Sequence, residues 1–239
     1  MIPKKIHYCW FGRGEMPQLA KMCIESWKQH LPEYEIKRWD EDSFDLDKYL
    51  YVREAYDSKR YAFVTDVVRL YALYTEGGIY MDTDVEVLKP IDCLLEYDAI
   101  SGFETDTNIP TGLMGSIAQH PMINELLKEY EDCHFKSENG GIDLTTNVER
   151  ITSTFLKYGL LQNNTKQTIN GFTLLPKDYL CPKSYKDGKI YLTENTLTIH
   201  HFAGSWYTPK EKIKQRIAKI LGKRISKCIV KLKSLVCKH

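Results

Sequence analysis

Two aspartates one residue apart, Asp82 and Asp84, occur in the stretch GGIYMDTDVEVL, directly after the apolar residues 79–81. Aspartate is a common turn residue, so one interpretation of the pair is a turn at the end of a strand. The residues after the pair are again apolar, however, which argues against a simple exit into solvent. Two neighbouring carboxylates repel each other, and a hard divalent cation such as Mg²⁺ or Mn²⁺ would relieve that repulsion. Because such a cation completes its shell with water and phosphate oxygens, the pair favours a diphosphate ligand.

The segments around the aspartates predict an α/β fold. Residues 4–12 are typical of a strand, residues 17–32 of a helix between two prolines, and residues 34–40 of a second strand. This order predicts a βαβ unit and favours a parallel sheet. Apolar residues then recur at helical spacing from 58 to 75, and Gly77 and Gly78 end that helix. Ligands of such sheets bind beyond the carboxyl ends of the strands, where the aspartates are expected.

The remaining chain alternates further helices and strands. Helices are expected at residues 120–133 and 147–159, and strand-like segments at 98–104, 172–182 and 195–206. No internal repeat and no low-complexity segment interrupts them.

Composition limits the class of protein. With 239 residues and 43% apolar residues, the chain can form one large domain, or one domain plus a small appendage. No apolar run approaches the ~18 residues that span a bilayer, and the N-terminus lacks the apolar stretch of a signal peptide. The seven cysteines are scattered and form no C-x-x-C pair, which favours a reduced cytosolic setting over a zinc ribbon or disulfide framework.

Three blocks of sequence resemble glycosyltransferase family 32, the sugar transferases that carry a DXD motif. They are YAFVTDVVRLYALYTEGGIYMDTDVEVLKPID at 61–92, IPKKIHYCWFG at 2–12 and HHFAGSW at 200–206. The resemblance implies a catalytic domain over 1–208 with the glycosyltransferase-A fold, a Rossmann-like α/β sandwich. It also implies a sugar-nucleotide donor, Mn²⁺ or Mg²⁺ as cofactor, and retention of anomeric configuration.

The resemblance assigns roles to four charged residues. Asp84 would ligate the metal directly, and Asp82 would reach it through water or contact the donor ribose and sugar. Asp66 and Arg69 match positions that hold the donor sugar hydroxyls and phosphate. They are three residues apart on a predicted helix, so the alternative is an intrahelical ion pair on the surface.

Further site residues follow from the same resemblance. Trp10 would stack on the nucleotide base, with an ordinary core tryptophan as the alternative. Tyr80 would lie beside the base or sugar, or pack in the core. Ser205 and Trp206 would belong to a loop that closes over the donor.

A histidine is expected as a third metal ligand, because neutral imidazole suits a cation at a diphosphate. Related folds use a late histidine followed by x-x-Gly, and HFAG places that role on His201. His200 would then point to the opposite face if the strand continues.

No residue is recognisable as a nucleophile or general base, which fits a front-side retaining displacement. The sequence therefore predicts a glycosyltransferase that moves a hexose from a nucleotide sugar to a glycan or lipid-linked oligosaccharide in surface polysaccharide synthesis. A UDP-sugar is favoured as donor, and GDP-mannose is possible. The alternative is an inactive sugar-nucleotide or glycan-binding protein, although such a relative would usually lose Asp82, Asp84 or Arg69.

The C-terminal segment 209–239 differs in charge from the rest. Residues 210–239 have a balance of +10, whereas residues 1–209 have a balance of −9. Its isoleucines, leucines and valines recur at helical spacing, which predicts a basic amphipathic helix on an anionic membrane surface. Docking on the acidic body and pairing of two tails are alternatives, and nucleic acid would leave the apolar stripe unused. The expected location is cytoplasmic, peripheral on the inner face of the membrane.

Overall fold

The computed structural model describes residues 1–110, 112–137, 141–184 and 187–204. The chain divides into two compact units, Met1–Phe202 and Ala203–His239. Only Ala203 and Gly204 of the second unit are described, so the predicted basic helix and the predicted boundary at residue 208 lie outside the described residues. None of the helices in the described part has the length and hydrophobicity needed to span a bilayer.

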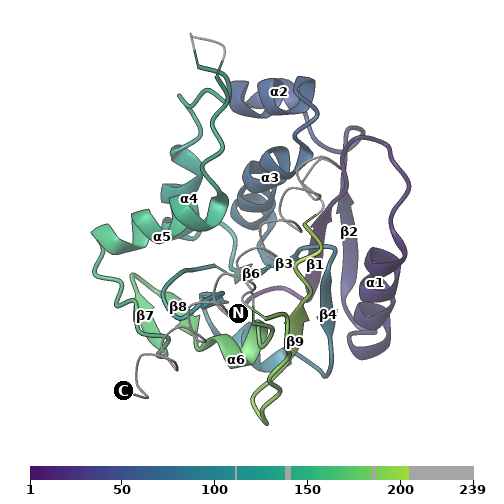
Figure 1. Cartoon of the computed structure of the whole chain (residues 1–239), viewed down its shortest axis with the longest axis vertical. Coiled ribbons are helices and arrows are strands. Elements are labelled where there is room, and N and C mark those ends of the chain that lie inside the picture. The colour runs from purple at the N-terminus through teal and green to yellow at the C-terminus, as the bar shows by residue number, and fades with distance from the viewer. Residues whose placement is uncertain (111, 138–140, 185–186, 205–239) are drawn as a thin grey trace, which may run out of the picture. The chain divides into compact units, whose positions relative to one another are not determined.

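The first unit is built around a central sheet (Figure 1). Among the described residues, the sheet has the strand order β2-β1-β3-β6-β5-β8-β7, and β4 pairs with β9 in a separate ribbon. The strands are β1 Lys5–Cys9, β2 Glu35–Trp39, β3 Gly78–Met81, β4 Val85–Val87, β5 Ala99–Gly102, β6 Leu113–Ser116, β7 Gln167–Ile169, β8 Phe172–Leu175 and β9 Thr198–His200. The helices are α1 Gln18–His30, α2 Leu50–Asp57, α3 Tyr61–Glu76, α4 Pro121–Lys128, α5 Asn147–Lys157 and α6 Lys177–Leu180, with short 3₁₀ turns at Leu46–Lys48 and Asp92–Glu96.

The predicted α/β class is confirmed, but the sheet is mixed rather than parallel. Strands β1 and β2 pair in parallel across α1, as the βαβ prediction required, and β1 also pairs in parallel with β3. Strand β6 then runs antiparallel to both β3 and β5. Because β6 opposes both neighbours, β3 and β5 run in the same direction, and their carboxyl ends lie at the same edge of the sheet.

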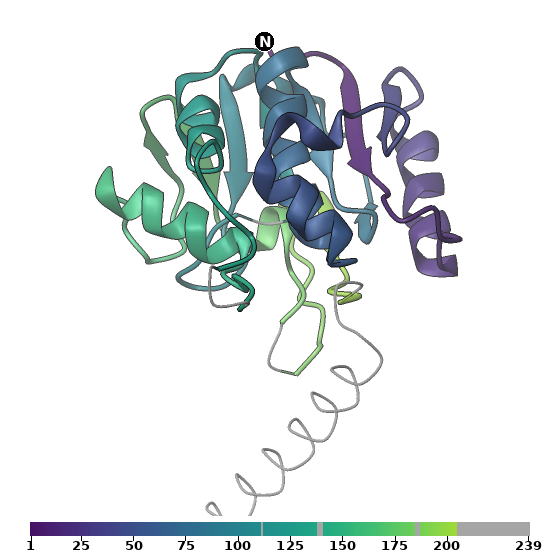
Figure 2. The same ribbon diagram turned by 90° about the horizontal axis from the view of Figure 1, so that it is seen from above.

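The two faces of the sheet carry separate hydrophobic clusters. Residues alternate along β3, so Tyr80 joins the cluster formed with α2, α3, α4 and α5, whereas Ile79 and Met81 join the cluster formed with α1 and β4. Figure 2 shows helices on both sides of the sheet. The strand that carries the DXD motif is therefore buried on both faces, which fixes the position of the residues after it.

Two glycines connect α3 to β3, as the sequence predicted. Gly77 has φ +66° and Gly78 has φ +107°, in the region that favours glycine. The Gly77 amide donates to the Leu73 carbonyl at 3.0 Å and ends the helix. A Cβ at Gly77 would lie only 2.7 Å from the backbone nitrogen of Ala118, so this position requires glycine for space as well.

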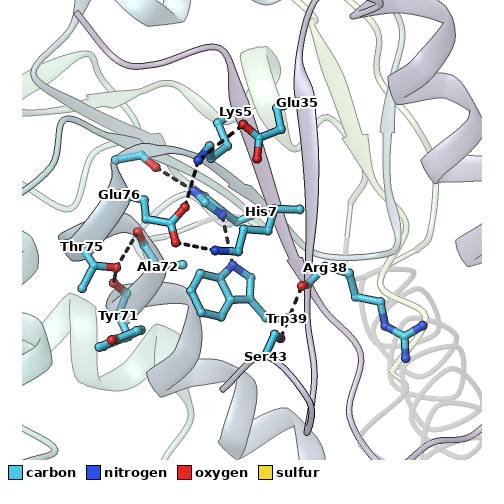
Figure 3. Close-up of polar contacts among 12 residues, drawn as sticks. Lys5, His7, Glu35, Arg38, Trp39, Ser43, Tyr71, Ala72, Thr75 and Glu76 are labelled. Atoms are coloured by element: carbon cyan, nitrogen blue, oxygen red, sulfur yellow. Dashed lines mark hydrogen bonds and ion pairs between the residues drawn. The ribbon is translucent and has the colours of Figure 1, made fainter. Parts of the chain in front are cut away.

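A polar cluster holds the end of α3 against β1 and β2 (Figure 3). The Nε2 of His7 donates to the Gly77 carbonyl at 2.7 Å, and its Nδ1 accepts from the Trp39 indole at 3.1 Å. Glu76 accepts from Lys5 at 3.0 Å and from Lys37 at 2.5 Å. Burial lowers the pKa of His7, which keeps the ring neutral and suited to one donor and one acceptor bond.

The β4–β9 ribbon brings the C-terminal end of the unit to the DXD motif. Val85 pairs with His200 and Val87 with Thr198 in antiparallel register. Helix α1 supports this ribbon, because the Trp27 indole donates to the Val85 carbonyl at 2.7 Å and the Val87 amide donates to Ser26 Oγ at 3.0 Å.

Candidate functional site

Two aspartates and one histidine converge beyond the carboxyl end of β3. Asp82 follows β3, Asp84 precedes β4, and His200 ends β9. One ligand atom from each lies within 4.8 Å of the others. The Nε2 of His200 is 3.4 Å from Asp84 Oδ1. The structure thus brings together the two aspartates predicted from sequence, together with a histidine from a strand more than 100 residues later.

This histidine is His200 and not the predicted His201. The Nε2 of His201 lies 2.7 Å from Glu86 Oε2, and its backbone nitrogen donates to the Asp84 carbonyl at 2.9 Å. Successive side chains of an extended strand point to opposite faces, so only one of the two histidines can face the aspartates. The pairing of Val85 with His200 decides which one.

The cluster fits a divalent cation. Ligand atoms around a cation at 2.0–2.1 Å lie about 3 to 4.2 Å apart, and the 3.4 Å between His200 and Asp84 falls in that range. Burial opposes the charge of His200, but Asp84, together with Cys181 and Glu104, raises the pKa of His200 well above 6.5. Protonated His200 places a positive charge beside the carboxylates. A bound cation would supply that charge instead, and the imidazole would then be neutral.

Arg69 links α3 to the motif. Its Nη2 lies 3.1 Å from Asp82 Oδ1 and 3.2 Å from Asp66 Oδ1. The side chains of Arg69 and Asp66 are only 8% and 10% exposed, which rules out the alternative of a surface ion pair. Tyr80 supports the same carboxylate, because its hydroxyl donates to Asp82 Oδ1 at 2.9 Å and its ring lies 4.6 Å from the Arg69 guanidinium carbon.

Electrostatics distinguish the two partners of Arg69. Burial opposes the charge of Arg69, but Asp82, Tyr80 and Asp66 together raise its pKa, so it stays protonated. Burial raises the pKa of Asp66 to about 7 in spite of the neighbouring Arg69. Asp66 is therefore a buried carboxyl group whose pKa lies near neutral pH, and such shifted pKa values are common at functional sites.

Sequence reasoning missed two residues at this site. A Cβ at Gly112 would lie 2.9 Å from Val85 Cγ2, 3.1 Å from Asp82 Oδ2 and 3.2 Å from His200 Cδ2, and the Gly112 carbonyl accepts from the Asp82 amide at 2.8 Å. Glu104 follows β5 at the same edge of the sheet, and burial raises its pKa while the charges of His200 and Asp82 also act on it. Neither residue lies in a recognisable motif, so only the strand order could have revealed them.

The other predicted residues have different outcomes. Trp10 lies just after β1, half-buried, and its indole donates to the Gly14 carbonyl at 2.7 Å. Tyr80 is 1% exposed and packs in the core, with only its hydroxyl directed to the motif. Ser205 and Trp206 lie outside the described residues. The roles of these residues toward a nucleotide stay predictions.

Comparison with known proteins identifies the segment that holds the aspartates. Residues 17–101 match the family model of the glycosyltransferase sugar-binding region containing the DXD motif. This segment matches the DXD glycosyltransferases. The resemblance stated from the sequence is thereby confirmed, and the match includes the DXD residues themselves together with Asp66 and Arg69.

Several curated relatives of this chain carry mannosyltransferase names. An inositol phosphoceramide mannosyltransferase of Schizosaccharomyces pombe is 34% identical over 135 residues, which cover 53% of this chain and 36% of that protein. A mannosyl phosphorylinositol ceramide synthase of Saccharomyces cerevisiae is 28% identical, over 57% of this chain and 36% of that protein. The chain therefore spans about a third of the length of these relatives. An uncharacterized glycosyltransferase of Acanthamoeba polyphaga mimivirus is 27% identical over 89% of this chain and 86% of its own length.

Solved glycosyltransferases also resemble the chain. The PaToxG glycosyltransferase has a TM-score of 0.44 at 20% identity, over 53% of this chain and 58% of its own. The galactosyltransferase LgtC has a TM-score of 0.43 at 12% identity, over 92% of this chain and 95% of its own. Because these TM-scores lie below 0.5, the α/β class rests on the strand order described above.

Proposed function

We propose that the chain is a metal-dependent glycosyltransferase that moves a hexose from a nucleotide sugar to a glycan acceptor. The observation that carries the proposal is the cluster of Asp82, Asp84 and His200 at the carboxyl edge of the sheet, within a DXD glycosyltransferase segment. Carboxylates and imidazole at that edge suit a cation that meets the diphosphate of a donor.

The residues of the chain have separate tasks in this proposal. Asp82, Asp84 and His200 would hold Mn²⁺ or Mg²⁺, which supplies positive charge to the departing diphosphate. Arg69 fixes Asp82 and, as the family resemblance implies, offers its guanidinium to the donor phosphate. Asp66 accepts hydrogen bonds from the hydroxyls of the transferred sugar.

The proposed reaction retains the anomeric configuration. The bond from the anomeric carbon to the diphosphate oxygen breaks, and a bond from that carbon to the acceptor oxygen forms on the same face. The acceptor proton passes to the leaving phosphate oxygen, so no protein base is needed. The anomeric configuration of the product, read by NMR, tests this part separately.

The donor and acceptor are open to a direct screen. The sequence favours a UDP-sugar, whereas the mannosyltransferase names of the curated relatives favour GDP-mannose. The same names add an inositol phosphate lipid to the glycan and lipid-linked oligosaccharide acceptors. GDP-mannose is therefore the first donor to test, ahead of UDP-glucose, UDP-galactose and the UDP-N-acetylhexosamines.

The experiment measures donor hydrolysis by the full chain with Mn²⁺, with Mg²⁺ and with EDTA. We expect turnover of at least one donor that requires the metal. Metal-dependent binding of a nucleoside diphosphate without turnover of any donor or acceptor would favour the alternative, an inactive sugar-nucleotide-binding protein. Neither turnover nor metal-dependent binding would reject both.

We also propose that residues 210–239 hold the enzyme at an anionic membrane surface on the cytoplasmic side. Its support is the sequence pattern alone, a balance of +10 with apolar residues at helical spacing. Attachment there would bring the site to lipid-linked acceptors.

A further inference from the structure

Several buried polar atoms have no hydrogen-bond partner among the described residues, and they are unevenly distributed. Four belong to one region, between α2, α3 and the start of α5: Tyr51 Oη, Arg69 Nε, Asn147 Oδ1 and Arg150 Nε. The others belong to Tyr34, Glu41 and His200. In folded proteins roughly nine in ten buried polar groups are paired, so a group of four in one region requires an explanation.

Tyr51 and Arg150 lie beside each other, next to Tyr130. The rings of Tyr51 and Tyr130 lie 5.0 Å apart, and the guanidinium carbon of Arg150 is 5.7 Å and 5.3 Å from their centroids. Asn147 and Arg150 lie three residues apart on α5 and so share a face of the helix. Tyr51 is 0% exposed and Asn147 is 7% exposed, so neither atom is satisfied by open solvent.

The same place adjoins the predicted sugar-binding pair. Arg69 belongs to both groups, since its Nη2 contacts Asp66 and Asp82 while its Nε has no partner. Burial raises the pKa of Tyr51, and the charges of Asp66 and Arg150 act on the same hydroxyl. The charge of Arg150 also acts on Asp66, so the group of unpaired atoms lies next to the predicted sugar-binding pair.

The charges around this group favour a neutral ligand. Arg150 is already paired with Asp143, and Arg69 is paired with two carboxylates. The charges of Asp66 and Asp143 both act on Tyr51, so they would oppose an additional phosphate there. The unpaired atoms offer a hydroxyl that can donate or accept, an amide oxygen that accepts, and guanidinium N–H groups that donate. This mixture matches the hydroxyls of a sugar ring.

We propose that Tyr51, Asn147 and Arg150 bind the hydroxyls of the transferred hexose that lie beyond Asp66, and thereby determine which hexose the chain accepts. This inference rests on the proposed function. A site that hydrogen-bonds a substrate hydroxyl rejects analogues that lack it, because its own buried groups are then left unpaired.

The test compares nucleotide sugars with the bare nucleoside diphosphates. Tyr51→Phe removes only the unpaired hydroxyl, and Asn147→Ala removes the unpaired amide oxygen while keeping a good helix former. Binding of GDP-mannose and GDP, and of UDP-glucose and UDP, is measured by calorimetry with Mn²⁺ on the full chain. We expect each variant to weaken binding of the preferred nucleotide sugar about 2- to 10-fold, as for the loss of one hydrogen bond, and to leave the diphosphate unchanged.

Tyr34→Phe is the matched control, because its hydroxyl is also buried and unpaired but lies in the other hydrophobic cluster. It should change neither affinity. Wild-type affinity for the nucleotide sugar in both Tyr51→Phe and Asn147→Ala would overturn the inference. An equal loss of affinity for the diphosphate would also overturn it, because it would indicate a structural effect. If the wild-type chain binds neither class of nucleotide, the proposed function itself fails.

Discussion

The guanidinium of Arg69 lies 3.1 Å from the carboxylate of Asp82, so helix α3 directly positions the first aspartate of the DXD motif. The two residues are 13 positions apart, and the Gly77–Gly78 turn between them reverses the chain. Arg69 also contacts Asp66, so its buried guanidinium lies between two carboxyl groups that would otherwise repel each other. The arrangement predicts that the charged groups act as a unit.

Asp84 is expected to be the critical metal ligand. Asp84→Ala should weaken Mn²⁺-dependent binding of a nucleoside diphosphate by at least about 100-fold, because even partners of metal ligands typically contribute 10- to 100-fold. Calorimetry with and without EDTA measures it. Asp57→Asn, an exposed change on α2, serves as control. Unaltered binding in Asp84→Ala would mean that the metal is held elsewhere.

Substitutions of His200 and His201 should have different effects on metal binding in the same assay. His200→Gln is expected to reduce Mn²⁺ affinity about 10-fold or more, since His200 lies beside Asp84. His201→Gln should have little effect, because His201 contacts Glu86 instead. A larger loss in His201→Gln than in His200→Gln would restore the assignment predicted from the sequence.

Gly112 should tolerate no side chain. In Gly112→Ala the new Cβ would press on Val85, Asp82 and His200, so Mn²⁺ affinity and turnover should both fall while the chain remains folded. Titration of manganese by electron paramagnetic resonance measures the affinity. Gly14→Ala is the control, because a Cβ at Gly14 meets nothing within 4 Å. Equal behaviour of the two variants would show that the space beside the aspartates is not needed.

The raised pKa of Asp66 predicts that the stability of the folded chain depends on pH. Its pKa rises from an ordinary 3.8 to about 7 in the folded state, so between these values the folded protein keeps a proton that the unfolded chain has released. Stability therefore falls as pH rises from about 4 to 7 and levels off above. Asp66→Asn lacks this titration, so it should gain stability relative to wild type from pH 5 to pH 8 in urea unfolding. The opposite trend would mean that the ion pair with Arg69 outweighs burial.

The basic segment can be tested by truncation. A chain that ends at residue 209 should lose binding to vesicles containing phosphatidylserine, and the full chain should be released from them by high salt. Vesicle flotation measures both, with phosphatidylcholine vesicles as the control for surface charge. Undiminished flotation of the truncated chain would contradict the membrane proposal.

The α3–β3–DXD segment could be predicted because its signals are local. Helical periodicity, two glycines and a short apolar strand follow one another within 25 residues, and each limits the backbone of its neighbours. These local signals were enough to predict the elements that carry Asp66, Arg69, Asp82 and Asp84. The reversal at β6 carried no such signal, which is why a parallel sheet was expected and why Glu104 and Gly112 were overlooked.

The choice between His200 and His201 depended on a pairing between distant strands. The x-x-Gly pattern favoured His201, but a shift of one residue in the β4–β9 register exchanges the faces of the two histidines. That register is set by contacts 115 positions apart in the chain, such as the one between Glu86 and His201. No local pattern contains this information.

The hydrogen bond from Trp27 to the Val85 carbonyl extends sensitivity to mutation well beyond the residues that meet a ligand. Helix α1 contributes nothing to the metal-ligand cluster among the described residues, yet it holds the strand on which the spacing of Asp84 and His200 depends. A genetic survey of inactivating substitutions should therefore return changes along α1, and these would be mistaken for substrate contacts if the map were drawn from phenotype alone.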